Sequence, residues 1–152
     1  MIAISLPRAR RFAFSVLLAA LALPVLARDE RHSYPIQDVL SGQSEYGRLD
    51  RSIGLYFANQ AHPPVEKNLG EFRTNKKTNG FVKSDKEACE RAFLSALIEL
   101  QQRTRKEGGD AVVGITSNYR NQEWRSESEY RCGSGALMSG VALKGTVVKL
   151  AK

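Results

Sequence analysis

The sequence contains two cysteines, Cys89 and Cys132, and their side chains offer the clearest chemistry in the chain. Two thiols can be oxidised to a disulfide, which persists in an oxidising compartment. As thiolates they could instead bind a soft metal such as copper(I) or zinc, with His62 as a third ligand. Closed zinc sites take four ligands, and no Cys-x-x-Cys pair preorganises such a site here. We therefore expect a disulfide between Cys89 and Cys132, with a metal site formed by Cys89, Cys132 and His62 as the alternative.

A second group of side chains is basic and could bind an anion or an acidic partner. It lies before and just inside the start of the longest predicted helix, where backbone N–H groups also suit an anion. The alternative of a solvated loop without a ligand stays open, because the net charge is modest. The members of this basic group are Arg73, Lys76, Lys77, Lys83 and Lys86.

The sequence shows no catalytic constellation. Its two histidines, His32 and His62, fall in segments that we expect to be loops facing solvent. A nucleophilic triad requires a base held against a nucleophile by a third group, and no such pattern is present. No Gly-x-x-x-x-Gly-Lys-Ser/Thr loop is present to bind phosphates. We therefore expect a protein without enzymatic activity and without a cofactor.

The best-specified element is a helix that begins after Ser84. The segment Ser84-Asp85-Lys86-Glu87 matches a capping box, in which the serine hydroxyl bonds the glutamate amide. Apolar side chains then recur at spacings of three and four residues, which is typical of a helix packed by one face. Gly108-Gly109 can end the helix, because glycine accepts a left-handed C-cap conformation. The apolar stripe consists of Cys89, Ala92, Phe93, Ala96, Leu97 and Leu100.

Alternation of apolar and polar residues predicts strands on both sides of this helix. Before it we expect strands at 52–58 and 65–74, with a bulge or close backbone approach at Gly70 and a polar loop at 75–80. After it we expect strands at 110–119, 124–132 and 137–150, joined as a meander through a hairpin turn at 120–123. Val113 and Ile115 should share one face of the first of these. The predicted fold class is α+β, in the order β-β-α-β-β-β, with one long helix packed on a small antiparallel or mixed sheet.

The first 27 residues have the layout of an export signal. Arg8, Arg10 and Arg11 precede an apolar run at 12–23, and Ala27 ends a segment suited to signal peptidase. The apolar run is shorter than the about 20 residues that span a bilayer. Without this signal Lys+Arg falls from 23 to 20 against 16 Asp+Glu, so the formal net charge falls from +7 to +4. We expect cleavage after Ala27, a periplasmic location, no membrane anchor after cleavage and no binding of nucleic acid.

The rest of the chain fits one domain preceded by an arm. Residues 28–50 are polar and contain turn formers, so we expect an irregular arm there, apart from a short ordered piece at Ile36–Leu40. Residues 51–152 contain the predicted helix and strands and should form the α+β domain.

Two segments resemble a known family. They are Gly108-Gly109-Asp110-Ala111-Val112-Val113-Gly114-Ile115 and the stretch Val-Ala-Leu-Lys-Gly-Thr-Val-Val-Lys-Leu at 141–150. Both resemble the signature of the YbjQ-like proteins, which carry a heavy-metal-binding label, and the periplasmic domain of the lipoprotein that senses envelope stress in the Rcs phosphorelay. Exported proteins often mislabelled as excinuclease ATPase subunits are similar over nearly the whole mature chain, including 74–79 and 88–93.

This resemblance implies the α+β fold, and wider family members form ring-like oligomers. The stress sensor's lipid-anchoring cysteine, long proline-rich tether and two disulfides have no counterpart here, so its role does not carry over. We expect a non-catalytic, exported envelope module that binds an unknown envelope partner or associates with itself. The alternative is a soft-metal-binding protein that uses Cys89 and Cys132.

Overall fold

The computed structural model describes residues 29–42, 48–80 and 84–152. The predicted signal at 1–27 and the predicted contact residue Lys83 lie outside the described residues. Within the described ranges, no helix is long and apolar enough to cross a membrane. The elements in chain order are β1 (Glu30–Pro35), α1 (Ile36–Leu40), β2 (Gly54–Phe57), β3 (Val65–Asn79), α2 (Asp85–Glu107), β4 (Ala111–Ser117), the 3-10 turn η1 (Tyr119–Asn121), β5 (Glu129–Ser134) and β6 (Met138–Leu150).

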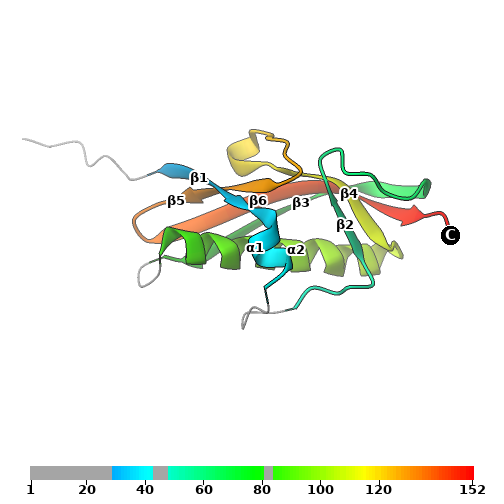
Figure 1. The fold of residues 1–152 in the computed structure, drawn as a ribbon, viewed down its shortest axis with the longest axis horizontal. Coiled ribbons are helices and arrows are strands. Elements are labelled where there is room, and N and C mark those ends of the chain that lie inside the picture. Colours follow the sequence, from blue (N-terminus) through cyan, green and yellow to red (C-terminus); the bar gives the residue numbers. More distant parts are fainter. Residues whose placement is uncertain (1–28, 43–47, 81–83) are drawn as a thin grey trace, which may run out of the picture.

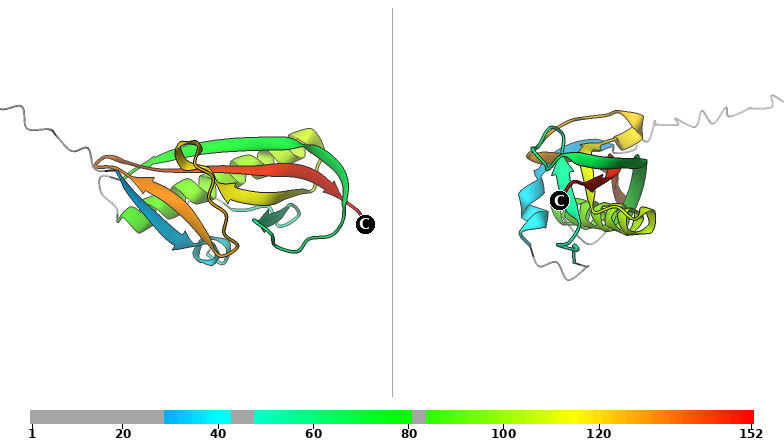
Figure 2. Two further views of the ribbon diagram at one scale, coloured as in Figure 1. Left: turned by 90° about the horizontal axis from the view of Figure 1, so that it is seen from above. Right: turned by 90° about the vertical axis from the view of Figure 1, so that its right-hand side faces the viewer.

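The fold is α+β, with α2 packed on a six-stranded mixed sheet in which β6 is central. β3 pairs antiparallel with β6 from Val65 opposite Leu150 to Asn79 opposite Met138. Because a strand has two edges, β4 and β5 share the other edge of β6, at residues 143–148 and 139–140. β2 adds in parallel to β4, and β1 adds antiparallel to β5. α2 lies along one face of this sheet, whereas the yellow η1 turn lies on the opposite face (Figures 1 and 2).

The apolar stripe of α2 supplies much of the core, as predicted. All six of its members are at most 1% exposed. Phe93 stacks on Tyr130 of β5 with parallel rings whose centroids are 3.8 Å apart. Full burial of one large apolar side chain contributes about 1.5–3 kcal/mol, so this stripe dominates the attachment of α2 to the sheet. The sheet side of the core includes Val112, Ile115, Val141, Leu143 and Val147.

Both ends of α2 are correctly predicted. The Ser84 hydroxyl accepts a hydrogen bond from the Glu87 amide at 3.2 Å, as a capping box requires. At the other end Gly108 has φ +74°, and its N–H donates to the carbonyls of Thr104 and Arg105. Only glycine adopts this left-handed conformation without a steric cost, which explains why the helix ends here.

The predicted disulfide is present between Cys89 and Cys132. Their Cα atoms are 5.8 Å apart, and the two residues are separated by 43 positions in the sequence. By the chain-entropy treatment, closing a loop of this length stabilises the fold by about 4 kcal/mol. The bond joins the first turns of α2 to β5.

The N-terminal arm is more ordered than predicted. Residues Glu30–Pro35 were expected to be irregular, but they form β1 and pair antiparallel with β5, with Glu30 opposite Ser134. The short ordered piece predicted at Ile36–Leu40 is confirmed as α1. β1 has a polar sequence with only half-buried inner residues, so its alternation is weak and the strand depends on its distant partner.

The second predicted strand is longer than expected. β3 continues to Asn79, so the loop predicted at 75–80 is wrong for most of its length. Its polar end is paired throughout with β6, which supplies backbone hydrogen-bonding partners that the local sequence does not indicate. The bulge predicted at Gly70 is confirmed, since the register shifts between Asn68 and Gly70, and Gly70 has φ +115°.

The predicted meander after α2 is confirmed only for its last two strands. β4 does not pair with β5: its Ser117 forms an isolated bridge with Trp124, which precedes β5, and β4 pairs with β6 instead. The pairing of the last two predicted strands is confirmed, because β5 pairs antiparallel with β6 at Gly133 and Ser134.

β4 also contains a bulge at Gly114, where φ is +63°. The extra residue reverses the alternation of side chains between the two faces of the strand. Val112 and Ile115 therefore lie in the core, instead of Val113 and Ile115 sharing one face.

Candidate metal centre

The predicted soft-metal alternative is not formed in this structure. The disulfide uses both sulfur atoms of Cys89 and Cys132, so neither is a thiolate. The His62 Nδ1 atom instead lies 2.8 Å from the carbonyl oxygen of Pro63, and its ring packs against Tyr56. The sulfur atoms therefore have a structural role.

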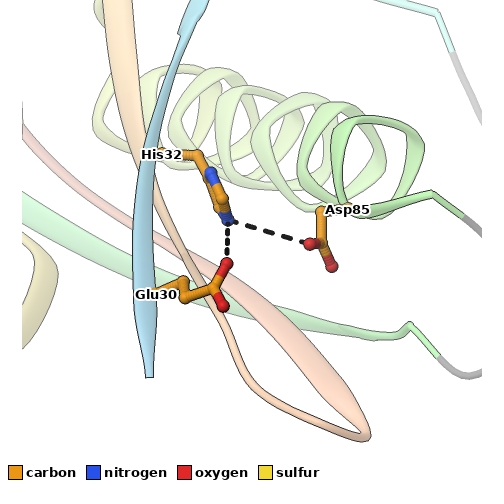
Figure 3. A group of neighbouring side chains, drawn as sticks. All are labelled: Glu30, His32 and Asp85. Carbon is orange, nitrogen blue, oxygen red and sulfur yellow. Dashed lines mark ion pairs between the residues drawn. The ribbon is translucent and has the colours of Figure 1, made fainter. Parts of the chain in front are cut away.

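A different set of side chains, Glu30, His32 and Asp85, meets where β1 passes the start of α2 (Figure 3). His32 Nε2 lies 3.5 Å from a carboxylate oxygen of Glu30 and 3.7 Å from one of Asp85. One ligand atom from each of the three residues lies within 4.8 Å of the others. All three side chains point toward a common point between the strand and the helix.

Two local geometries and the disulfide bring these three residues together. Glu30 and His32 are two positions apart on β1, so the pleat places them on the same face. His32 is opposite Cys132 in the β1–β5 ladder, and Cys132 is bonded to Cys89. Asp85 is four positions before Cys89 on α2, so both lie on one face of the helix. The disulfide therefore holds Asp85 beside His32.

The separations in this cluster are too long for good hydrogen bonds. His32 Nε2 is buried and has no hydrogen-bond partner among residues 29–42, 48–80 and 84–152, although 28% of the side chain as a whole is exposed. Ligand atoms bound to one tetrahedral zinc ion at 2.0–2.1 Å are about 3.3 Å apart. The observed gaps of 3.5 and 3.7 Å need only small side-chain movements to match that separation.

The surroundings of the cluster are partly buried and rich in negative charge. The ring of Tyr34 packs against His32, and the pKa of Tyr34 is raised by burial and by the charges of Asp85 and Glu90. Behind it, the Tyr130 hydroxyl is buried without a hydrogen-bond partner in the described part of the chain, and burial raises the pKa of this group far above its ordinary value. The charge of Lys86 acts in the opposite direction on Tyr34. The carboxylates that would favour a cation at this place are those of Glu30 and Asp85 themselves.

The predicted basic group is not brought together. Lys76 and Lys77 are neighbours on β3, so they point to opposite faces of the sheet. Lys76 pairs with Glu99 of α2 at 3.2 Å, and Arg73 lies 3.4 Å from Glu71.

Lys86 is also occupied by ion pairs. It lies 2.8 Å from Asp38 and 3.6 Å from Glu90, and the hydrogen bond to Asp38 raises its pKa. The members of the predicted basic group that the structure describes therefore do not form one anion-binding surface.

Comparisons with protein-family models, with curated proteins and with solved structures find no match. The residues of the site must therefore be interpreted from their own geometry.

Sequence reasoning placed His32 in an irregular arm and did not identify the cluster. The available signal was the Glu-x-His spacing of Glu30 and His32, which puts both side chains on one face if the segment is a strand. Asp85 was identified only as part of the capping box. Its proximity to His32 depends on the β1–β5 pairing and the disulfide, neither of which is a local property.

Proposed function

We propose that this chain is a non-catalytic, exported protein of the cell envelope that functions by binding, and that Glu30, His32 and Asp85 bind one divalent cation. The observation that carries this proposal is the position of His32 Nε2, which lies between two carboxylate oxygens without a hydrogen bond to either. A buried polar atom normally has a partner, and a cation held by the two carboxylates would supply one for His32 Nε2.

The donor set favours zinc or a similar first-row metal. Imidazole nitrogen suits zinc, copper, iron and nickel, whereas calcium and magnesium prefer sites made only of oxygen ligands. Three protein ligands leave one position of a tetrahedral zinc ion open. That position could be filled by water or by a donor group of a partner, which connects the cation to a binding role.

The test is a calorimetric titration of the purified protein with Zn²⁺. We expect one saturable site, and we expect His32→Asn and Asp85→Asn each to weaken it by about tenfold or more. Bound zinc should also raise the melting temperature of the wild-type protein, because a ligand that binds only the folded state stabilises it.

His62→Asn is the matched control, because His62 is the only other histidine and lies outside the cluster. It should leave the zinc affinity unchanged. If the cluster is only a structural ion pair of a protonated His32, zinc will not bind saturably, or His32→Asn will bind it as well as the wild type. Either result would refute the cation site.

The proposal that the protein is exported is supported by the disulfide, since disulfides persist in oxidising compartments. Periplasmic fractionation of cells, with N-terminal sequencing of the protein, tests export. A chain retained uncut in the cytoplasm with two free thiols would contradict it.

We also propose the YbjQ-like assignment, supported by a helix that ends at Gly108 and leads directly into β4.

Self-association is a second candidate function, favoured by the exposed edge of β3. Of the described strands, only β6 pairs with β3, so a long second edge of β3 has no strand partner within the described chain. Unpaired strand edges are natural sites for pairing with another chain. Light scattering over a range of protein concentrations tests this candidate, and a strict monomer at every concentration would contradict it.

A further inference from the structure

The turn between β5 and β6 exposes apolar side chains, whereas turns that face solvent are usually built from glycine, proline, asparagine, aspartate and serine. The Gly135 N–H donates to the Met138 carbonyl at 2.9 Å across this turn. Leu137 is 61% exposed and Met138 is 46% exposed, and Ala136 before them is exposed as well. We call Ala136, Leu137 and Met138 the apolar tip.

The apolar tip differs from the rest of the described surface. Among the described residues, the other exposed large apolar side chain is Val65, and it lies at the opposite end of the sheet, paired with Leu150. The segment 132–143, which includes the tip, contains no charged residue. Consecutive exposed apolar residues without a charge among them are unusual unless they have a function.

The chain that precedes β1 enters the domain beside the apolar tip. Glu30, the first residue of β1, is opposite Ser134, and β1 starts at the end of the sheet where the β5–β6 turn lies (Figures 1 and 2). Residues 24–29 connect β1 to the apolar run at 12–23. A connection of this length spans at most about 20 Å. While the apolar run is in the membrane during export, the tip end of the sheet is therefore the part of the domain held nearest to the bilayer.

An exposed cation lies next to the apolar tip. In the β3–β6 ladder Met138 is opposite Asn79, and Lys77 is two positions from Asn79 on the same strand. The Lys77 side chain is exposed, and it makes no ion pair with any residue in the described part of the chain. Basic side chains next to a membrane are attracted to anionic lipid headgroups. Lys77 is therefore placed to contact headgroups when the tip touches a bilayer.

We infer that the apolar tip docks on a phospholipid bilayer, with Leu137 and Met138 in the interfacial region and Lys77 against anionic headgroups. The inference rests on the export that we propose, and it is independent of cation binding by the His32 cluster. Burial of the apolar side chains provides the affinity, and the nearby cation adds to it. The contact is weak and reversible, since even one myristoyl chain binds membranes only marginally.

The test is cosedimentation of the purified protein, without residues 1–27, with vesicles of phosphatidylethanolamine and phosphatidylglycerol. We expect the bound fraction to rise with lipid concentration, and Leu137→Ser/Met138→Ser should lower the affinity about tenfold or more. Val65→Ser is the matched control, because Val65 is also exposed but lies at the other end of the sheet, and it should leave the affinity unchanged. Lys77→Gln should weaken binding about two- to fivefold, and only to vesicles that contain phosphatidylglycerol.

Three outcomes would overturn the inference. The first is no binding at any lipid concentration by a protein that fractionation shows to be exported, which would leave the export proposal intact. The second is binding that the double variant retains, which would mean a general attraction of a basic protein to anionic lipid. The third is self-association in light scattering that the double variant loses, without vesicle binding, which would make the tip a protein contact. An unchanged urea midpoint of the double variant shows that it is folded.

Discussion

The two ends of α2 are both tied to the N-terminal segment of the chain, but by different interactions. At the first end a covalent bond from Cys89 to Cys132 holds the helix to β5, and β1 pairs with β5 beside it. At the second end only hydrogen bonds and an ion pair connect the helix to Asp50.

The polar groups at the second end are fully satisfied. Gln101 is 3% exposed, its Oε1 accepts from the Asp50 amide at 2.8 Å, and its Nε2 donates to the carbonyls of Asp50 and Ile53. The Asp50 carboxylate accepts hydrogen bonds from Ser52 and Arg105.

Near the first end, His32 Nε2 and the Tyr130 hydroxyl have no hydrogen-bond partner among the described residues, and the same holds for the hydroxyls of Thr74 and Thr116 in the sheet. Unsatisfied buried groups cost stability, and the disulfide at the first end contributes enough to offset that cost. The satisfied end of α2 serves the fold, whereas the cation site that we propose lies at the end with the unpaired His32 Nε2.

Of the changes at the two ends of α2, removal of the disulfide should lower the free energy of unfolding most. The double variant Cys89→Ala/Cys132→Ala should lose about 4 kcal/mol in the free energy of unfolding, measured by urea denaturation. The wild-type protein with a reductant is the control and should unfold at a similar urea concentration. A double variant as stable as the oxidised wild type would show that the first end of α2 is held by packing alone.

Replacement of the buried Gln101 at the second end should cause the next largest loss of stability. Gln101→Leu removes the partner of the Asp50 amide and of two carbonyls, so stability should fall by about 1–3 kcal/mol. Gln102→Leu is a matched control, because Gln102 is the adjacent residue on the same helix and is exposed. Equal stability of the two variants would contradict a role for the hydrogen bonds of Gln101.

Removal of the N-terminal cap of α2 should cause a smaller loss of stability. Ser84→Ala leaves the Glu87 amide without its side-chain acceptor and should cost about 1 kcal/mol in thermal or urea unfolding. Ser95→Ala is the control, because the Ser95 hydroxyl only donates to the Arg91 carbonyl within the helix. A cost in Ser95→Ala as large as that in Ser84→Ala would argue against the capping role.

The surface ion pair at the second end should have the smallest effect, and it should depend on pH. Hydrogen bonds from Ser52 and Arg105 lower the pKa of Asp50 from 3.8 to about 2. The folded-state pKa is the lower one, so the stabilisation is present above the unfolded pKa and is lost as the pH falls toward 2.

Asp50→Asn should therefore lower the melting temperature slightly at neutral pH, and the difference should shrink near pH 2, where about half of the Asp50 carboxylates of the folded wild type are protonated. High salt should reduce the difference at neutral pH, because exposed pairs are screened. A difference that is the same at both pH values would mean that the carboxylate charge has no part in it.

Much of the fold could be predicted from the sequence, but the candidate site could not. The disulfide was predicted from two cysteines on elements expected to face each other, and the structure confirms it. His32 was assigned to a loop because β1 is polar and gains its order only from β5, about a hundred residues later. The extension of β3 to Asn79 was missed for the same reason, because β6 provides the pairing.

By itself the sequence determined α2, its buried stripe, its two caps and the bulge at Gly70, because each depends on residues within a few positions of one another. Only the tertiary structure decided that β4 pairs with β6 rather than with β5, that β1 exists as a strand, and that Glu30, His32 and Asp85 meet. The physical reason is that strand pairing satisfies backbone groups across long sequence separations, and a periodic pattern indicates which face of a strand is buried but not which strand lies beside it.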